Sequence, residues 1–226
     1  MNMNAVLTYL SDLEANNKRE WFHANKEQYQ TANREFEALI AELMLELRKT
    51  DKNIPLVEPK ELTFKLMRDT RFSHDKSPYN PAFRAHIAPK GKLPVPVGYY
   101  LMIRPGGRSF LGGGLFADMF RDATVMVRDY IAAHGGEWEK IITAPAFRKH
   151  FTVRGTTLKK VPQGYDPDHP QAEYLKHKSW YLEYPVTDEQ FMEPDFVGYC
   201  ADIFIKMQDF NGFLNKALAD FQMPVR

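Results

Sequence analysis

The strongest constraint on the fold is a series of short β-type runs joined by tight turns. The segments Pro89-Lys90-Gly91-Lys92 and Pro105-Gly106-Gly107 separate runs of alternating apolar and polar residues, and Pro and Gly are typical of chain reversals. Connections this short join antiparallel neighbours, because a parallel pair needs a long crossover. The predicted strands cover residues 62–69, 82–88, 97–104 and 108–115, and a last strand is expected at 179–184.

Helical periodicity before and after these runs predicts helices at both ends of the chain. Asn25, with Gln28 three residues later, has the pattern of a capping box, and Asp118 is expected to cap a later helix. The sequence therefore predicts a single α+β domain over residues 1–226, an antiparallel β-sheet flanked by N-terminal and C-terminal helices. The predicted helices lie near residues 6–13, 26–47, 119–133, 138–142, 145–151 and 194–221.

Cysteine content and hydropathy indicate the compartment. Cys200 is the single cysteine, so it cannot form an internal disulfide, which fits a reducing compartment. The first residues lack the basic and apolar regions of an export signal, and no run of about 18 apolar residues occurs. We therefore expect a cytoplasmic protein with no membrane partner. Cys200 lies on an apolar helical stripe, so we expect it to serve packing rather than catalysis.

Positive charge is distributed unevenly along the chain. The net charge is only +1, which argues against a uniformly basic surface that binds nucleic acid. Residues 60–108, however, hold ten Lys and Arg against three Asp and Glu, and residues 148–180 hold seven against three. If these segments meet in space, they focus positive potential on one cleft for an anionic ligand.

The densest polar feature is the segment 64–79, which carries Arg68, Arg71 and Lys76. In an extended chain Arg68 falls on the apolar side, where burial of an unpaired guanidinium costs several kcal/mol. It must therefore meet a carboxylate, carbonyl groups or a bound anion. One interpretation is that these three cations together bind a phosphate or carboxylate group, and that the Tyr79 hydroxyl is a further hydrogen-bond donor.

The same segment also allows a structural interpretation, in which Arg68 pairs with Asp69 or Asp75 and pins the turn. His86 lies on the polar side of its predicted strand, from which it can face the same cleft. Lys178 begins a predicted strand, so it joins the cluster if that strand lies beside the Arg68 segment. The candidate ligand-binding residues are Lys65, Arg68, Asp69, Arg71, Lys76, Tyr79, His86, Lys176 and Lys178.

The glycine run 112–114 precedes the expected helix start at Asp118, as phosphate-binding loops precede helices. Close packing of a strand explains these glycines at least as well, because no Lys-Ser/Thr pair follows. No metal site is predicted, since no paired CxxC or HExxH pattern occurs. The sequence identifies no cofactor and leaves open whether the protein is an enzyme.

Several motifs resemble those of one protein family. They include an Arg-Asp-x-Arg-Phe core at 68–72, an Asp-Lys-x-Pro-Tyr continuation at 75–79 and the helical start 17–22, and further motifs extend the match over nearly the whole chain. The sequence is similar to the uncharacterised bacterial family catalogued as domain of unknown function twenty-four sixty-one. Lys65 and Asn80 depart from it, standing where the family usually has Arg and Lys. The family has no established activity, so the resemblance sharpens the site without naming a reaction.

Three hypotheses about function follow. The first is a pocket that binds, or binds and turns over, a phosphorylated or carboxylated ligand, with His74 or His86 available for proton transfer. The second is a nucleic-acid-associated protein, with Tyr99, Tyr100 and Phe110 available for stacking on bases. The third is a non-catalytic interaction domain whose Arg-Asp network only braces the fold. The sequence does not indicate an oligomeric state.

Overall fold

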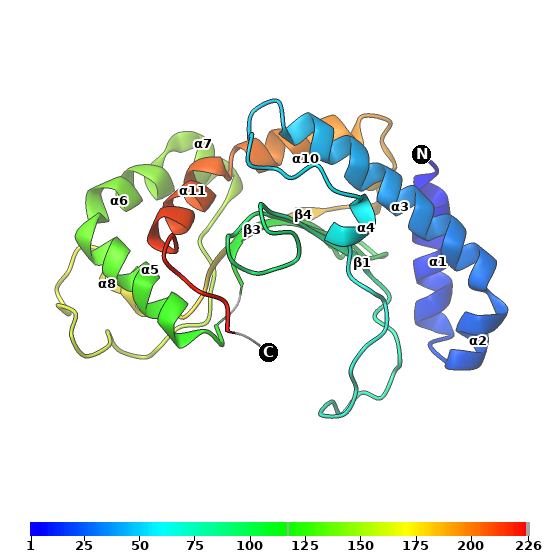
Figure 1. Ribbon diagram of the computed structural model, residues 1–226, viewed down its shortest axis with the longest axis horizontal. Helices are drawn as coiled ribbons and strands as arrows, with labels where there is room; N and C mark the ends of the chain where they lie inside the picture. Colours follow the sequence, from blue (N-terminus) through cyan, green and yellow to red (C-terminus); the bar gives the residue numbers. More distant parts are fainter. Residues whose placement is uncertain (117, 225–226) are drawn as a thin grey trace.

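The computed structural model describes residues 1–116 and 118–224 (Figure 1). These residues contain a four-stranded sheet in the order β1-β2-β3-β4. Each strand pairs with its sequence neighbours in antiparallel register, so the predicted antiparallel sheet and the α+β class are confirmed. The strands are β1 (Phe83–Ile87), β2 (Tyr99–Ile103), β3 (Ser109–Leu115) and β4 (Trp180–Val186).

Helices precede, interrupt and follow the sheet. The helices of the described residues are α1 (Met3–Ala15), α2 (Arg19–Ala24), α3 (Lys26–Leu47), α4 (Pro59–Leu62), α5 (Arg121–Ala133), α6 (Gly135–Thr143), α7 (Pro145–His150), α8 (Ala172–Leu175), α9 (Asp188–Met192), α10 (Phe196–Ile205) and α11 (Gln208–Ala217). In Figure 1, α3 and α10 lie above the sheet, α1 and α2 stand at one end, and α5, α6 and α8 gather at the other. No described helix has the length and apolar content that crossing a bilayer requires.

The two faces of the sheet differ, because successive side chains along a strand point to opposite sides. Leu101 and Leu111 on one face are fully buried, on the side where α3 and α10 pack. Arg84, Tyr100 and Phe110 lie on the other face and are only half-buried. We call this second face the open face, because no described helix lies below the sheet in Figure 1.

Both edges of the sheet carry short additional pairings. Thr63 pairs with Ala85 of β1, and Arg154 pairs with Tyr181 of β4, each as an isolated antiparallel bridge. At the β4 edge, Arg154 and Tyr181 exchange two backbone hydrogen bonds of 2.8 and 2.9 Å. The outer strands are therefore partly covered.

The predicted strand at 62–69 is wrong. Residues Pro59–Leu62 instead form α4, which has a proline in its first turn and a capping box between Glu58 and Glu61. Because this turn takes the chain out of the extended conformation, the segment that follows pairs with β1 through one backbone bridge, at Thr63, and through the Arg84 side chain, which donates to the Lys65 carbonyl at 3.0 Å. It then leaves the sheet.

Asn25 lies at the N-cap position of α3, as predicted, but neither Asn25 nor Asp118 makes the predicted capping hydrogen bond. Helical periodicity did not indicate α2, although the family resemblance indicated a helical start at 17–22. Asn25 lies at the end of that helix, where its Nδ2 donates to the Trp21 carbonyl at 2.8 Å. Its side chain therefore makes no capping box with Gln28 at the start of α3. The helix expected after Asp118 begins after Phe120, whose side chain makes no capping hydrogen bond.

The other predicted helices are confirmed with one division. The helix expected at 194–221 is formed by α10 and α11, which are separated at Lys206 and Met207. Cys200 lies in α10 and is fully buried, and burial raises the pKa of its thiol. The packing role expected of this cysteine agrees with that environment.

Candidate functional site

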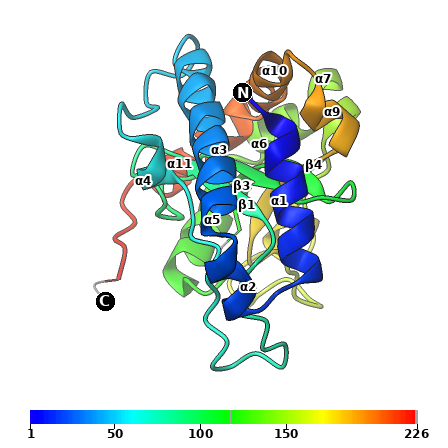
Figure 2. The same cartoon turned by 90° about the vertical axis from the view of Figure 1, so that its right-hand side faces the viewer.

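The Arg-Asp motif lies on a hairpin that projects from the body of the protein. Met67 pairs with Tyr79 as an isolated antiparallel bridge, and the N–H of Arg68 donates to the Pro78 carbonyl at 2.9 Å. Figures 1 and 2 show this segment extending away from the sheet. We call residues 66–80 the motif hairpin.

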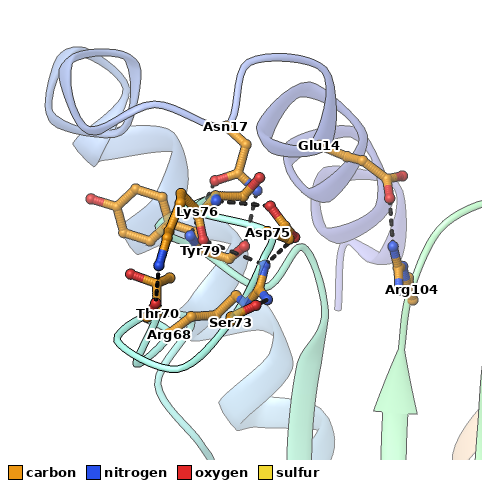
Figure 3. Close-up of polar contacts among 10 residues, drawn as sticks. Glu14, Asn17, Arg68, Thr70, Ser73, Asp75, Lys76, Tyr79 and Arg104 are labelled. Atoms are coloured by element: carbon orange, nitrogen blue, oxygen red, sulfur yellow. Dashed lines mark hydrogen bonds and ion pairs between the residues drawn. The ribbon is translucent and has the colours of Figure 1, made fainter.

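Asn17 fastens the base of the motif hairpin to the N-terminal helices. Its Oδ1 accepts from the Tyr79 N–H at 3.1 Å and its Nδ2 donates to the Tyr79 carbonyl at 2.9 Å (Figure 3). The Tyr79 ring is buried and stacks on Phe22 with 4.3 Å between centroids. Its hydroxyl points away from Arg68 and Lys76 in Figure 3, contrary to the sequence expectation. Tyr79 therefore anchors the hairpin.

Both arginines of the motif hold acids of the same hairpin. Arg68 pairs with Asp75, as the structural interpretation anticipated, and Arg71 contacts both carboxylate oxygens of Asp69, at 3.0 Å from Nε and 2.7 Å from Nη2. Hydrogen bonds from Ser77 and then Arg68 hold the pKa of the Asp75 carboxyl well below its usual range. Hydrogen bonds from Arg71 likewise lower the pKa of Asp69. These pairs stiffen the hairpin.

A cavity of about 300 Å³ nevertheless lies between the start of α2 and the motif hairpin. Its lining carries the cations Lys18, Arg19, Arg68 and Lys76 and one acid, Glu20. Of these cations, only Arg68 forms an ion pair with an acid among the residues the structure describes. We call this cavity the basic hollow.

The structure brings only part of the predicted cluster to this hollow. Arg68, Lys76 and Tyr79 line it, and the Nζ of Lys76 donates to the Thr70 carbonyl at 3.0 Å. Lys65, Asp69 and Arg71 are exposed and do not line it. Sequence analysis missed the contributions of residues 18 and 19, although both belong to the segment 17–22 on which the family resemblance rests.

Lys176 and Lys178 lie far from the motif hairpin in the sheet order. Lys176 pairs with Glu173, and the N–H of Lys178 donates to the Thr156 carbonyl at 2.7 Å, just before β4. The motif hairpin adjoins β1, and β2 and β3 separate that edge from β4. The expectation that the strand begun by Lys178 lies beside Arg68 is therefore wrong.

A second cavity, of about 280 Å³, lies on the open face. Its lining includes His86, Tyr100 and Phe110, so His86 shares this face with Arg84, as its strand position indicated, but does not reach the basic hollow. His86 is 7% exposed, and burial lowers the pKa of its imidazole to about 4, which leaves it neutral at pH 7. Tyr99, a predicted stacking residue, is buried on the opposite face.

The glycine run belongs to β3, so the phosphate-loop interpretation gives way to close strand packing. A Cβ at Gly113 would lie 3.0 Å from side-chain atoms of Met207 and Asn211. Gly114 has a φ of +92°, and a Cβ there would lie 2.4 Å from the Trp180 carbonyl oxygen. Within the described residues, no three His, Cys, Asp or Glu side chains are placed to hold a metal ion.

The fold and its cavities define a class of protein: an α+β domain with an antiparallel sheet open on one face and a cationic hairpin beside it. The chain matches the conserved hypothetical protein family DUF2461 over residues 5–213 and belongs to that family. This match confirms the resemblance drawn from the motifs. No curated protein and no solved structure matches the chain.

Proposed function

We propose that the protein binds a small ligand bearing a phosphate or carboxylate group in the basic hollow. The observation that carries the proposal is the convergence of Lys18, Arg19, Arg68 and Lys76 on one cavity of about 300 Å³. Cations gathered around a concave surface focus positive potential and raise the local concentration of anions. One acid, Glu20, lies in the lining, so cations outnumber acids there.

Arg68 supplies the directional part of this recognition. Its hydrogen bonds to the Ser77 carbonyl and the Ser73 hydroxyl are long, at 3.4 Å, so these N–H groups can turn toward a stronger acceptor. Lys76 acts as a point charge that adapts to the position of the anion. Arg68 already pairs with Asp75, so a bound anion replaces the Asp75 carboxylate as the partner of the Arg68 guanidinium.

The proposal concerns binding rather than catalysis. The lining of the basic hollow contains one carboxyl group and neither histidine nor cysteine. No general acid–base pair or activated nucleophile therefore accompanies the cations. His74 and His86, the residues considered for proton transfer, do not line this cavity.

A second candidate function is a non-catalytic interaction through the motif hairpin. Phe72 is 94% exposed on this projecting segment, and the Arg71 guanidinium lies 5.8 Å from its ring centroid. A large exposed ring beside a braced arginine resembles the aromatic and arginine anchors of protein interfaces. In this alternative the Arg71–Asp69 pair holds the anchor in place.

A thermal-shift comparison with inorganic phosphate, glucose 6-phosphate and citrate tests the proposal. Lys76→Met and Arg19→Met each remove a cation of the basic hollow, and Arg71→Met is the control because Arg71 lies on the same hairpin outside it. A ligand at about one hundred times its Kd stabilises the folded state by about 2.7 kcal/mol. In a chain of this length, that energy raises Tm by roughly 5–10 °C.

We expect at least one probe to raise the Tm of the wild type and of Arg71→Met, and to have little effect on the two hollow variants. Equal shifts in all four proteins, or no shift with any probe, would contradict the proposal. Oligonucleotide binding that falls steeply with salt would favour the nucleic-acid alternative instead.

A further inference from the structure

The cavity on the open face is walled by aromatic rings from separate parts of the sheet. Tyr100 of β2 stacks on Phe110 of β3 with 5.7 Å between ring centroids, and Phe116 stacks on Tyr181 of β4 at 4.5 Å. Tyr100 also contacts Phe116 at 5.6 Å, which joins the two stacks. Phe64 closes the β1 side, 6.2 Å from Tyr100. The walls therefore present ring faces and edges to one space of about 280 Å³.

Gly112 allows these rings to lie so close to the sheet. A Cβ at this position would lie 3.0 Å from the Phe116 ring and 3.3 Å from the Phe110 ring. Two residues further on, Gly114 lines the cavity, and its positive φ turns the chain so that Phe116 folds back over Gly112. The glycines thus leave a shallow trough in the sheet with aromatic sides.

The ends of the cavity differ in charge. At the β1 end, Lys92 lines the cavity and donates to the Thr63 carbonyl at 3.0 Å. Arg84 lies outside the lining, 5.5 Å from the Phe64 ring centroid, and donates to the Lys65 carbonyl at 3.0 Å. Neither cation is paired with an acid in the part of the chain that the structure describes. At the β4 end, Glu183 is neutralised by Arg154 at 2.9 Å. The cavity therefore has one cationic end and one balanced end.

We propose that this cavity binds a planar heteroaromatic ligand whose anionic substituent lies at the β1 end. Stacking on ring faces selects planar ligands, because a flat ring can contact the aromatic walls over its whole surface. Lys92, the cation in the lining, selects the charge. The volume is close to the lower end of the usual range for small-ligand pockets, which suits one fused ring system. This inference does not depend on the basic hollow, because the two cavities share no lining residue.

Calorimetry and NMR with adenosine 5′-monophosphate and indole-3-carboxylate test the inference, with adenosine and inorganic phosphate as controls. We expect each anionic aromatic probe to bind and to shift the resonances of the Tyr100, Phe110 and Phe116 rings. Phosphate alone is expected not to shift them. Adenosine, which has the ring without the charge, is expected to bind about tenfold more weakly than its monophosphate.

Matched variants separate stacking from charge recognition. Phe116→Ala removes a partly exposed wall and is expected to weaken both anionic probes by about tenfold, while the exposed Phe72→Ala leaves them unchanged. Lys92→Met is expected to reduce the preference for the monophosphate over adenosine without changing adenosine affinity. Lys76→Met, in the basic hollow, is expected to change none of these values.

Three results would overturn the inference. One is the absence of ring shifts in the wild-type protein with both aromatic probes at millimolar concentration, a measurement that needs no variant to fold. Another is equal binding of adenosine and its monophosphate. The third is a single-stranded oligonucleotide that binds far more tightly than the monophosphate with steep salt dependence, which would make the open face a nucleic-acid surface.

Discussion

Replacing Asn17 with Ala is expected to loosen the motif hairpin from the N-terminal helices. The Asn17 side chain makes two part-buried hydrogen bonds, of 2.9 and 3.1 Å, to the backbone of Tyr79, 62 residues away. A protein hydrogen bond contributes about 0.5–1.5 kcal/mol net, so losing two is expected to lower the free energy of unfolding by about 2 kcal/mol. For a chain of this length the corresponding fall in Tm is about 4–8 °C.

Urea denaturation followed by circular dichroism measures this change directly, because a lower midpoint at an unchanged slope reports lost stability. The matched control is Asn16→Ala, which removes a side-chain hydrogen bond of 3.0 Å to the nearby Asp12 carbonyl at the end of α1. We expect the control to cost less than about 1 kcal/mol, since a single exposed bond is lost. If Asn17→Ala differs from the wild type by no more than this control, the hairpin is held by other contacts and the reasoning is wrong.

Three further expectations concern titratable or charged side chains that are buried or paired: His86, Glu14 and Arg128. The imidazole of His86, whose pKa burial lowers to about 4, is expected to stay neutral down to about pH 5 in an NMR titration, and protonation near its usual value of 6.5 would refute its burial. Hydrogen bonds from Arg108 and then Arg104 lower the pKa of Glu14 to about 2, and Figure 3 shows the Arg104 pair. The stabilisation of the fold by the ionised Glu14 is therefore complete above pH 4.5 and is lost as the pH falls towards 2. Glu14→Gln is therefore expected to flatten the acid side of the stability–pH curve, and an unchanged curve would contradict this. Buried Arg128 donates two hydrogen bonds, of 3.0 and 2.7 Å, to the His177 carbonyl, so Arg128→Met is expected to lower the free energy of unfolding by about 2 kcal/mol in urea, and a change under about 0.5 kcal/mol would refute that role.

The sheet was predictable because its signals are local. Alternating runs and short Pro- and Gly-containing turns determine strand direction without any knowledge of distant contacts. The exception, residues 62–69, also has a local cause. The capping box between Glu58 and Glu61, together with Pro59, starts a helical turn that ends at Leu62, where the predicted strand was to begin. The residues after it form only isolated bridges, at Thr63 and Met67.

The site was predictable only in part, because it depends on contacts between distant segments. The composition of the motif identified Arg68 and Lys76, and the alternative partner Asp75 followed from simple charge pairing. Their neighbours Lys18 and Arg19 come from a segment about fifty residues earlier, which lies there because of the α1–α2 turn and the hairpin anchor. A sequence pattern contains no direct signal for that approach.

The sequence identified residues of the open face one by one but did not show that they form one cluster. The positions of His86, Tyr100 and Phe110 in alternating strands indicated polar or stacking roles for each of them. Their convergence depends on strand register, since His86 pairs with Tyr100 across β1 and β2, and Tyr100 pairs with Gly112 across β2 and β3. Register is set by the turns and the buried face together, so the alternation pattern alone did not determine which rings become neighbours.

The short pairings at the two sheet edges affect how copies of the protein meet in a crowded solution. An uncovered outer strand offers free amide and carbonyl groups, which another chain can extend into a growing intermolecular sheet. Thr63 beside β1 and Arg154 beside β4 occupy part of these groups, and Pro185 within β4 has no amide hydrogen to offer. Assembly by strand addition is thereby disfavoured, so self-association into fibrils would first require the chain to detach one of these covering segments.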